Sequence, residues 1–380
     1  MTTPLFDVSH VDARSGARAG RMSTAHGTCE TPCFLPIASH GTLRALGFEQ
    51  AAACGTSIIM ANAWYMFAST SVEALHRSGG AHGQMGWPGI LFTDSGGYQV
   101  FSLQDDCLIT NDGVAFGKNG EVLTPEYVVE MQKHLGSDIM MVLDDCAAYP
   151  CAKTRAEDAV RRTTLWATRS LAAYDRIECA YGHSQYIYGI VQGGVYEDLR
   201  QQSCREVAAL DFSGFGIGGL SICMPRTAVR EMTLLCSELL PSDKPRHLLG
   251  VGLPRQILEG VEDGADTFDC VLPIRKAQRG VAYTRSGVLY YKKPQCERQR
   301  DEPLDSHCTC STCGAWSQES LRLLFKSDKS KAGMLVAIHN LHFYHEVLRG
   351  ARDAIRGNRF SSYKSDFISA WEAGELERAQ

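Results

Sequence analysis

The stretch Ile-Met-Met-Val-Leu-Asp-Asp, residues 139–145, joins an unbroken apolar run to a pair of carboxylates. Consecutive apolar residues are typical of a strand that is covered on both faces of a parallel sheet. Seven other short apolar runs recur along the chain, with helical stretches between them, and this alternation predicts parallel βα units. Eight such units favour a closed (β/α)8 barrel, although the pattern alone leaves an open doubly wound sheet possible. The eight runs lie near residues 33–37, 57–60, 90–93, 139–143, 186–191, 214–217, 247–251 and 267–271.

Polar residues gather at the carboxyl ends of these runs. Asp94 follows the third run, Asp144 and Asp145 follow the fourth, and Asp269 lies within the eighth. In an α/β barrel the loops at that end converge on one pocket, so we expect an active site lined by these carboxylates. An Asp at a strand end is also a common helix N-cap, which is the alternative interpretation for Asp94. Asp269 is harder to explain in this way, because an unpaired carboxylate inside an apolar strand is costly.

Composition limits the class of protein. The chain has 380 residues, of which 44% are hydrophobic, enough to bury one large core with an appendage. Its net charge of −5 does not indicate nucleic-acid binding, so any RNA contact requires a local basic patch. The 15 cysteines are scattered through apolar runs, as free thiols are, and residues 1–12 lack the pattern of a signal peptide. We therefore expect a cytoplasmic protein without a membrane span.

A cysteine cluster follows the eighth run. Cys308, Cys310 and Cys313 lie close together, and His339 follows 26 positions later in a helical stretch. Three thiolates and one imidazole complete a tetrahedral structural zinc site with no open position for water. The alternative is a loop with three surface cysteines. Three further histidines are alternatives to His339 as the fourth ligand: His307, His342 and His345.

Six stretches of the chain stand out in order: FTDSGGYQVFSL (92–103), IVQGG (190–194), GFGIGGLS (214–221), LLGVGLP (248–254), FDCVLPIR (268–275), and the CxCxxC cluster with AIHNLHFY (337–344). They resemble the tRNA-guanine transglycosylases, in the order that this family has, from about Arg18 to Arg356. The resemblance implies a TIM barrel over residues 1–285, a zinc-binding subdomain over 286–345 and a C-terminal helical segment over 346–380 that completes the barrel.

The resemblance also implies an activity and a role for each site residue. The family exchanges guanine at the wobble position of the tRNA anticodon for a 7-deazaguanine base and acts as dimers, so a homodimer is expected. Asp269 matches the nucleophile of a double displacement, and Asp94 matches the general acid/base. Cys308, Cys310, Cys313 and His339 match the zinc ligands. The base pocket matches at Asp144, Gln192, Gly219 and Leu220, which hydrogen-bond the purine, and at Tyr98 and Leu249, which contact its two faces. Asp145 is expected to support them.

A basic stripe directly after Asp269 is the candidate RNA contact. It begins with Arg275, Lys276 and Arg279, which we expect to contact anticodon-loop phosphates. A solvated charged loop is the alternative for each residue singly. The family often has a second arginine where this chain has Gln278. The stripe continues at Lys292, Lys293, Arg298 and Arg300.

The incoming base is less clearly encoded. Met224 stands where bacterial members usually have a glutamate, and a methionine cannot hold the backbone there as a carboxylate would, which argues against a cationic aminomethyl substituent on the base. Cys146 and the bulky Ile222 instead favour the small base 7-aminomethyl-7-deazaguanine over queuine, and we expect the smaller base.

Other functions remain open on the sequence. The chain could be an inert partner subunit of a heterodimer, but the presence of both catalytic aspartates and the zinc ligands argues against this. A barrel enzyme for a small phosphorylated metabolite would explain Gly250-Val251-Gly252 but not the cysteine cluster. Base exchange in DNA or in another RNA is not excluded by the catalytic residues.

Overall fold

The protein is described here as a computed structural model. The structure describes residues 4–96, 107–116, 121–221, 224–291 and 301–379. Six residues of the sequence predictions lie outside these ranges: Tyr98, Ile222, Lys292, Lys293, Arg298 and Arg300.

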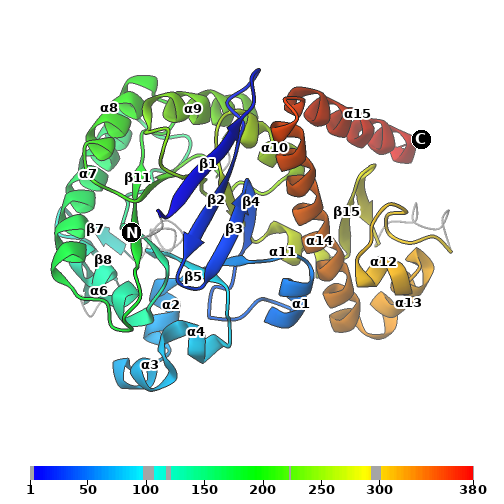
Figure 1. Ribbon diagram of the computed structural model, residues 1–380, viewed down its shortest axis with the longest axis horizontal. Helices are drawn as coiled ribbons and strands as arrows, with labels where there is room; N and C mark the ends of the chain where they lie inside the picture. The colour runs from blue at the N-terminus through cyan, green and yellow to red at the C-terminus, as the bar shows by residue number, and fades with distance from the viewer. Residues whose placement is uncertain (1–3, 97–106, 117–120, 222–223, 292–300, 380) are drawn as a thin grey trace.

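Eight parallel strands form the central sheet, and the strands follow one another around it in chain order (Figure 1). The sheet closes between its first and second strands, where Ile37 forms a bridge to Met60 and the Ala38 N–H donates to the Met60 carbonyl at 2.7 Å. The (β/α)8 barrel that the sequence predicted is therefore confirmed. Its strands are β4 (Cys33–Pro36), β5 (Ile58–Asn62), β6 (Ile90–Asp94), β10 (Ile139–Met141), β11 (Tyr186–Val191), β12 (Gly214–Ile217), β13 (Arg246–Leu248) and β14 (Thr267–Cys270).

The strands are apolar because both of their faces are covered. Every residue of β4, β5, β10, β12 and β13 is buried. Helices outside the barrel cover the outer face, as Figure 1 shows. Around the barrel these helices are α1 (Phe48–Ala53), α2 (Ala63–Ala68), α3 (Val72–Ser78), α4 (Gly80–Met85), α6 (Pro125–Leu135), α7 (Lys153–Arg176), α8 (Glu197–Ala208), α9 (Arg226–Leu239), α10 (Pro254–Glu262) and α11 (Leu272–Ala277).

An insertion between β6 and α6 forms a small antiparallel sheet of β7 (Cys107–Ile109), β8 (Val114–Phe116) and β9 (Glu121–Leu123). Its apolar side packs on Trp166 of α7 in a core of its own. Thr124 then caps α6 by accepting a hydrogen bond from the Tyr127 N–H.

A second antiparallel sheet lies at the amino-terminal end of the barrel. It comprises β1 (Phe6–Val11), β2 (Arg18–Thr24) and β3 (Gly27–Thr31), and the sequence analysis did not predict it. Arg18 joins this sheet to the residue before β14, since its guanidinium donates to both oxygens of Asp266 at 2.8 and 2.6 Å. Arg18 and Asp266 are 3% and 0% exposed, so this pair ties the two sheets together inside the protein.

The C-terminal part begins with the hairpin β15 (Val281–Thr284) and β16 (Gly287–Tyr290), followed by α12 (Ser311–Ala315) and α13 (Gln318–Ser327). Helix α14 (Lys329–Arg356) then packs against β4, α1 and α10, which is the eighth helix position of the barrel. Helix α15 (Phe360–Ala379) leads away from its end, as Figure 1 shows. No helix in the described ranges is both long and apolar enough to cross a membrane.

Candidate functional site

Asp94 ends strand β6 at the carboxyl end of the barrel. The side chain of Asn62 and the N–H of Gly96 both donate to its Oδ1, at 2.6 and 3.0 Å. Burial raises the pKa of Asp94 to about 7, and the negative charges of Asp269 and Asp144 act in the same direction. A carboxyl group with this pKa can both donate and accept a proton near neutral pH.

Asp269 lies on β14 beside Asp94, and its side chain is 14% exposed. Its Oδ1 accepts from the N–H of Gly250 at 2.8 Å and lies 3.0 Å from Nε2 of His247. Nδ1 of His247 lies 2.8 Å from the Thr267 hydroxyl, which can donate to it, so Nε2 carries the proton that Asp269 accepts. Both donors contact the same oxygen. Among the described residues none donates a hydrogen bond to Oδ2, so this oxygen is available for another partner.

Asp144 and Gln192 form a buried pair beside these carboxylates. The Gln192 amide donates to Oδ2 of Asp144 at 2.6 Å. Gln192 is 1% exposed and Asp144 is 8% exposed. Burial raises the pKa of Asp144 to about 6. A carboxylate beside an amide offers both acceptors and donors to a ligand with mixed polar edges.

The loop after β12 approaches Gln192 closely. Gly219 has a φ of +71°, and a Cβ at this position would lie 2.4 Å from Oε1 of Gln192, so no other residue fits here without a shift. Leu220 next to it is fully buried, and Leu249 of the following loop is half-buried. Arg200, also fully buried, fixes this arrangement because its guanidinium donates to the carbonyls of Val191, Gly194 and Gly218.

Asp145 differs from its neighbour Asp144. Its two oxygens accept from Arg155 and Arg162, and its side chain is fully buried. A carboxylate that is paired with two arginines holds the loop after β10 in place and is not free for a ligand.

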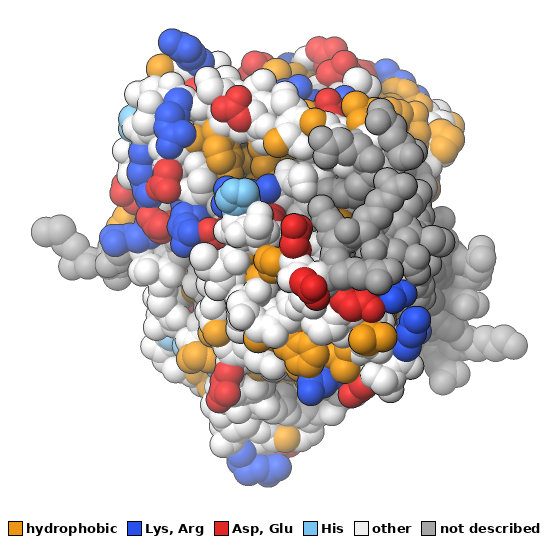
Figure 2. All heavy atoms as spheres, turned by 90° about the vertical axis from the view of Figure 1, so that its right-hand side faces the viewer, with side chains coloured by type: hydrophobic (Ala, Val, Ile, Leu, Met, Phe, Trp, Pro, Cys, Tyr) orange, Lys and Arg blue, Asp and Glu red, His pale blue; other side chains and the backbone are white. Residues whose placement is uncertain are grey.

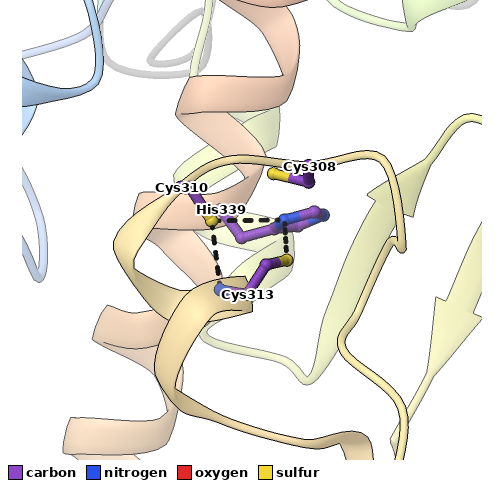
Figure 3. Close-up of side chains that lie close together, drawn as sticks. All are labelled: Cys308, Cys310, Cys313 and His339. Carbon is purple, nitrogen blue, oxygen red and sulfur yellow. Dashed lines mark hydrogen bonds between the residues drawn. The ribbon is translucent and has the colours of Figure 1, made fainter.

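The cysteine cluster and His339 come together as the sequence predicted (Figure 3). The ligand atoms of Cys308, Cys310, Cys313 and His339 all lie within 4.8 Å of one another. Nδ1 of His339 lies 3.3 Å from the Cys313 sulfur and 3.7 Å from the Cys310 sulfur. Its Nε2 donates to the Tyr283 carbonyl at 2.8 Å, which leaves the lone pair of Nδ1 facing the thiols. This donor set and orientation fit a structural zinc ion.

The other three histidines are directed elsewhere. Nε2 of His345 lies 2.9 Å from the Thr56 hydroxyl, and that of His342 lies 3.3 Å from the Thr309 hydroxyl. His307 is largely exposed, with 74% of its side chain accessible.

The candidate RNA contacts lie on and just after α11, which directly follows Asp269. Arg275 and Arg279 are exposed and Lys276 is half-buried. No ion pair in the described ranges involves these three side chains, so their charges are available to a ligand. The face of the molecule in Figure 2 mixes basic and acidic side chains, and no single-sign surface dominates its described part.

Known proteins resemble this chain over almost its whole length. The family model described as Queuine tRNA-ribosyltransferase matches residues 12–373. The chain belongs to this family. A queuine tRNA-ribosyltransferase of Desulforudis audaxviator is 40% identical over 370 residues, which are 96% of this chain and 98% of the relative. That of Desulfosudis oleivorans is 41% identical over 376 residues, covering 97% and 96%. That of Listeria innocua is 38% identical over 375 residues, covering 98% and 97%.

Membership of the queuine tRNA-ribosyltransferase family confirms the resemblance inferred from the motifs. Three residues of the site were not singled out from the sequence: Asn62, His247 and Arg200. Asn62 ends a strand, as Asp94 does, so the rule that strand ends collect polar residues would have found it. His247 and Arg200 gave no such signal, because each acts through a partner that only the folded chain brings near.

We predict that His339→Ala lowers the bound zinc by one equivalent per chain, because Nδ1 of this residue is the only imidazole nitrogen among the four clustered ligand atoms. His342→Ala and His345→Ala are the matched controls and should keep their zinc. Metal analysis of the purified variants measures the difference. Full zinc retention in His339→Ala would rule out this ligand.

We also predict that Asp94→Asn changes how stability depends on pH. Burial holds the pKa of Asp94 near 7, above its ordinary value of 3.8, so the folded wild type loses stability as pH rises through this interval. Asparagine keeps the Oδ1 acceptor but cannot ionise. The variant should therefore gain roughly 1–3 kcal/mol relative to wild type between pH 5 and pH 8 in urea unfolding.

The exposed Asp243→Asn serves as the control for the same charge change. If the free energy of unfolding depends on pH in the same way for Asp94→Asn and wild type, the raised pKa of Asp94 is contradicted.

Proposed function

We propose that this chain is a tRNA-guanine transglycosylase that replaces guanine at the anticodon wobble position with a 7-deazaguanine base. The observation that carries the proposal is the placement of two carboxylates with different surroundings, Asp94 and Asp269, at one mouth of the barrel in a member of this family. Two carboxyl groups with separate tasks are what a glycosyl transfer with retention needs.

In the proposed reaction Asp269 is the nucleophile. Its Oδ2 forms a bond to the anomeric carbon of the ribose while the bond from that carbon to the guanine nitrogen breaks. The N–H groups of His247 and Gly250 hold Oδ1, so the carboxylate keeps one orientation during attack. The incoming base then displaces Asp269, and the two inversions restore the original configuration.

Asp94 is the proposed general acid and base. Its pKa of about 7 means that a large fraction is protonated at neutral pH, so it can give a proton to the departing guanine. The resulting carboxylate can take a proton from the incoming base. The hydrogen bonds from Asn62 and Gly96 to Oδ1 keep the group in place through both steps.

Purine selection is assigned to the groups around Gln192. Asp144 accepts hydrogen bonds from the N–H groups of the purine, while the Gln192 amide and the backbone of Gly219 and Leu220 donate to its carbonyl oxygen. The raised pKa of Asp144 supports this role, because a ligand N–H would stabilise the ionised form that burial disfavours. Tyr98, whose placement is not described, and Leu249 are the proposed contacts to the two faces of the base.

The incoming base is proposed to be 7-aminomethyl-7-deazaguanine. Cys146 directly follows the Asp144–Asp145 pair and is half-buried, so the residue that favours the smaller base lies beside the proposed purine pocket. The relatives are named for queuine, which is the alternative base.

RNA binding is assigned to Arg275, Lys276 and Arg279, because they lie on and just after α11, which follows the proposed nucleophile, and they have no acidic partner in the described ranges. The zinc ion would be structural. A homodimer and a cytoplasmic location are part of the proposal, and every cysteine in the described ranges is a free thiol, which suits a reducing compartment.

We predict that Asp269→Ala abolishes exchange of labelled guanine into tRNA, lowering the rate by about 10³-fold or more, because no covalent intermediate can form. The wild type should give an RNA-linked protein band on a denaturing gel, and the variant should give none. Asp243→Ala, which removes an exposed carboxylate outside the site, is the control, and it should retain the band. Normal exchange by Asp269→Ala would exclude the mechanism.

We also predict that 7-aminomethyl-7-deazaguanine competes with labelled guanine for wild-type enzyme at lower concentration than queuine does. Competition curves with both bases measure this preference. Efficient use of queuine, with no use of the aminomethyl base, would reverse the assignment.

A further inference from the structure

A second cluster of metal-type ligands lies at the amino-terminal end of the barrel, away from Asp94 and Asp269. His26 lies in the turn between β2 and β3, His82 lies on α4, and Asp138 immediately precedes β10. Their ligand atoms all lie within 4.8 Å of one another. Three segments that are far apart in the sequence thus bring two imidazoles and one carboxylate to a single point.

Asp138 presents both of its oxygens to this point. Its side chain is fully buried, with Oδ1 2.9 Å from Nδ1 of His26 and Oδ2 3.2 Å from Nε2 of His82. A zinc ion with bonds of about 2.0–2.1 Å separates its tetrahedral ligand atoms by about 3.3 Å. The observed separations are close to this value, so the three side chains can share one ion once the stacked rings of His26 and His82 turn their nitrogens toward it.

His82 supplies the independent observation. Its Nδ1 lies 3.0 Å from the Trp87 carbonyl, which can only accept, so Nδ1 carries the proton and Nε2 of the neutral ring has a lone pair. Nε2 is buried and has no hydrogen-bond partner among the described residues. The side chain as a whole is only 9% exposed. A buried nitrogen lone pair 3.2 Å from a carboxylate oxygen, with no proton shared between them, is unfavourable unless a cation lies close to both.

An ion pair between a protonated His82 and Asp138 is the competing explanation. It would place the Nε2 proton toward Oδ2, but the ring is not directed for a hydrogen bond to that oxygen despite the short distance. The rings of His26 and His82 also stack at 3.6 Å with an angle of 19°, which disfavours a positive charge on both. A single divalent cation bound by Nδ1 of His26, Nε2 of His82 and one oxygen of Asp138 removes this conflict.

We propose that His26, His82 and Asp138 bind a divalent transition-metal ion such as zinc, separate from the cysteine cluster. Binding displaces the proton that His26 Nδ1 shares with Asp138, and this proton leaves to solvent through the 27% of the His26 side chain that is exposed. Water fills the remaining coordination position on that side. The donor set of imidazoles and a carboxylate suits zinc and its neighbours more than calcium or magnesium.

The ion ties the amino-terminal sheet to the barrel. His26 belongs to the β2–β3 hairpin, whereas Asp138 also accepts the N–H of Leu91, the second residue of β6, at 2.9 Å. Asp94 lies three residues further along β6, at the opposite end of the strand. The metal therefore stabilises the fold without contacting the reacting groups.

The test is metal stoichiometry of the full-length protein after equilibration with zinc and gel filtration. We expect two equivalents per chain in wild type and one in His26→Ala and in His82→Ala. His134→Gln is the matched control, because this histidine also has a side chain that is 27% exposed but lies outside the cluster. It should keep both equivalents. His26→Ala changes only a turn residue, so it keeps the test valid if His82→Ala does not fold.

Cobalt added to wild type that carries one equivalent of zinc, at the cysteine cluster, gives a second readout. The ion at the second site should show visible d–d bands without the thiolate charge-transfer band that a cysteine site gives, and its binding should raise the melting temperature of wild type but not of His26→Ala. One equivalent only in wild type, a dissociation constant weaker than about 1 mM, or a second equivalent that survives in His26→Ala would overturn the proposal.

Discussion

The closure of eight parallel strands into a ring is the constraint on which the site depends. The bridge of Ile37 to Met60 joins the first and second strands, so the central sheet has no free edge. Every strand then points the same way, and all eight carboxyl ends lie on one rim. Asp94, Asp144 and Asp269 come from regions of the chain up to 175 residues apart (269 − 94 = 175), yet they share this rim. Side chains that would otherwise be scattered become one polar site.

Residues of one type acquire different properties on this rim because their partners differ. Burial raises the pKa of Asp94 to about 7 and that of Asp144 to about 6. Asp145 is held by two arginines, whereas Asp269 accepts from His247 and a backbone N–H through one oxygen. Such differences allow one site to contain a proton donor, a binding group, a structural anion and a nucleophile. The carboxylates with the fewest positive partners are those to which we assign chemistry.

Much of this arrangement could be predicted from the sequence, because strands that are buried on both faces must be apolar at consecutive positions. The cysteine cluster was found from its spacing, and His339 was singled out as its partner through the resemblance to the family. The partners of the site residues could not be found, since they depend on cross-strand register. Asn62 lies directly opposite Asp94, and His247 lies opposite Thr267, two residues before Asp269. The pairing register between neighbouring strands is a property of the closed sheet and cannot be deduced from the sequence of either strand alone. The amino-terminal sheet was missed because its short, half-exposed strands carry a weak apolar pattern.

Helix α14 connects the candidate metal ligands to the helix that follows the strand of Asp269, through two consecutive residues. His339 donates to the Tyr283 carbonyl and is a ligand candidate, while Asn340 accepts from the Tyr283 N–H and donates to the carbonyls of Pro273 and Val281. Pro273 belongs to α11, directly after the strand of Asp269. A metal that fixes His339 thereby also fixes the helix that carries Arg275 and follows the nucleophile. The cysteine cluster lies outside the barrel, but α14 contacts α11 through Asn340, so a structural ion at the cluster can influence the site without taking part in the reaction.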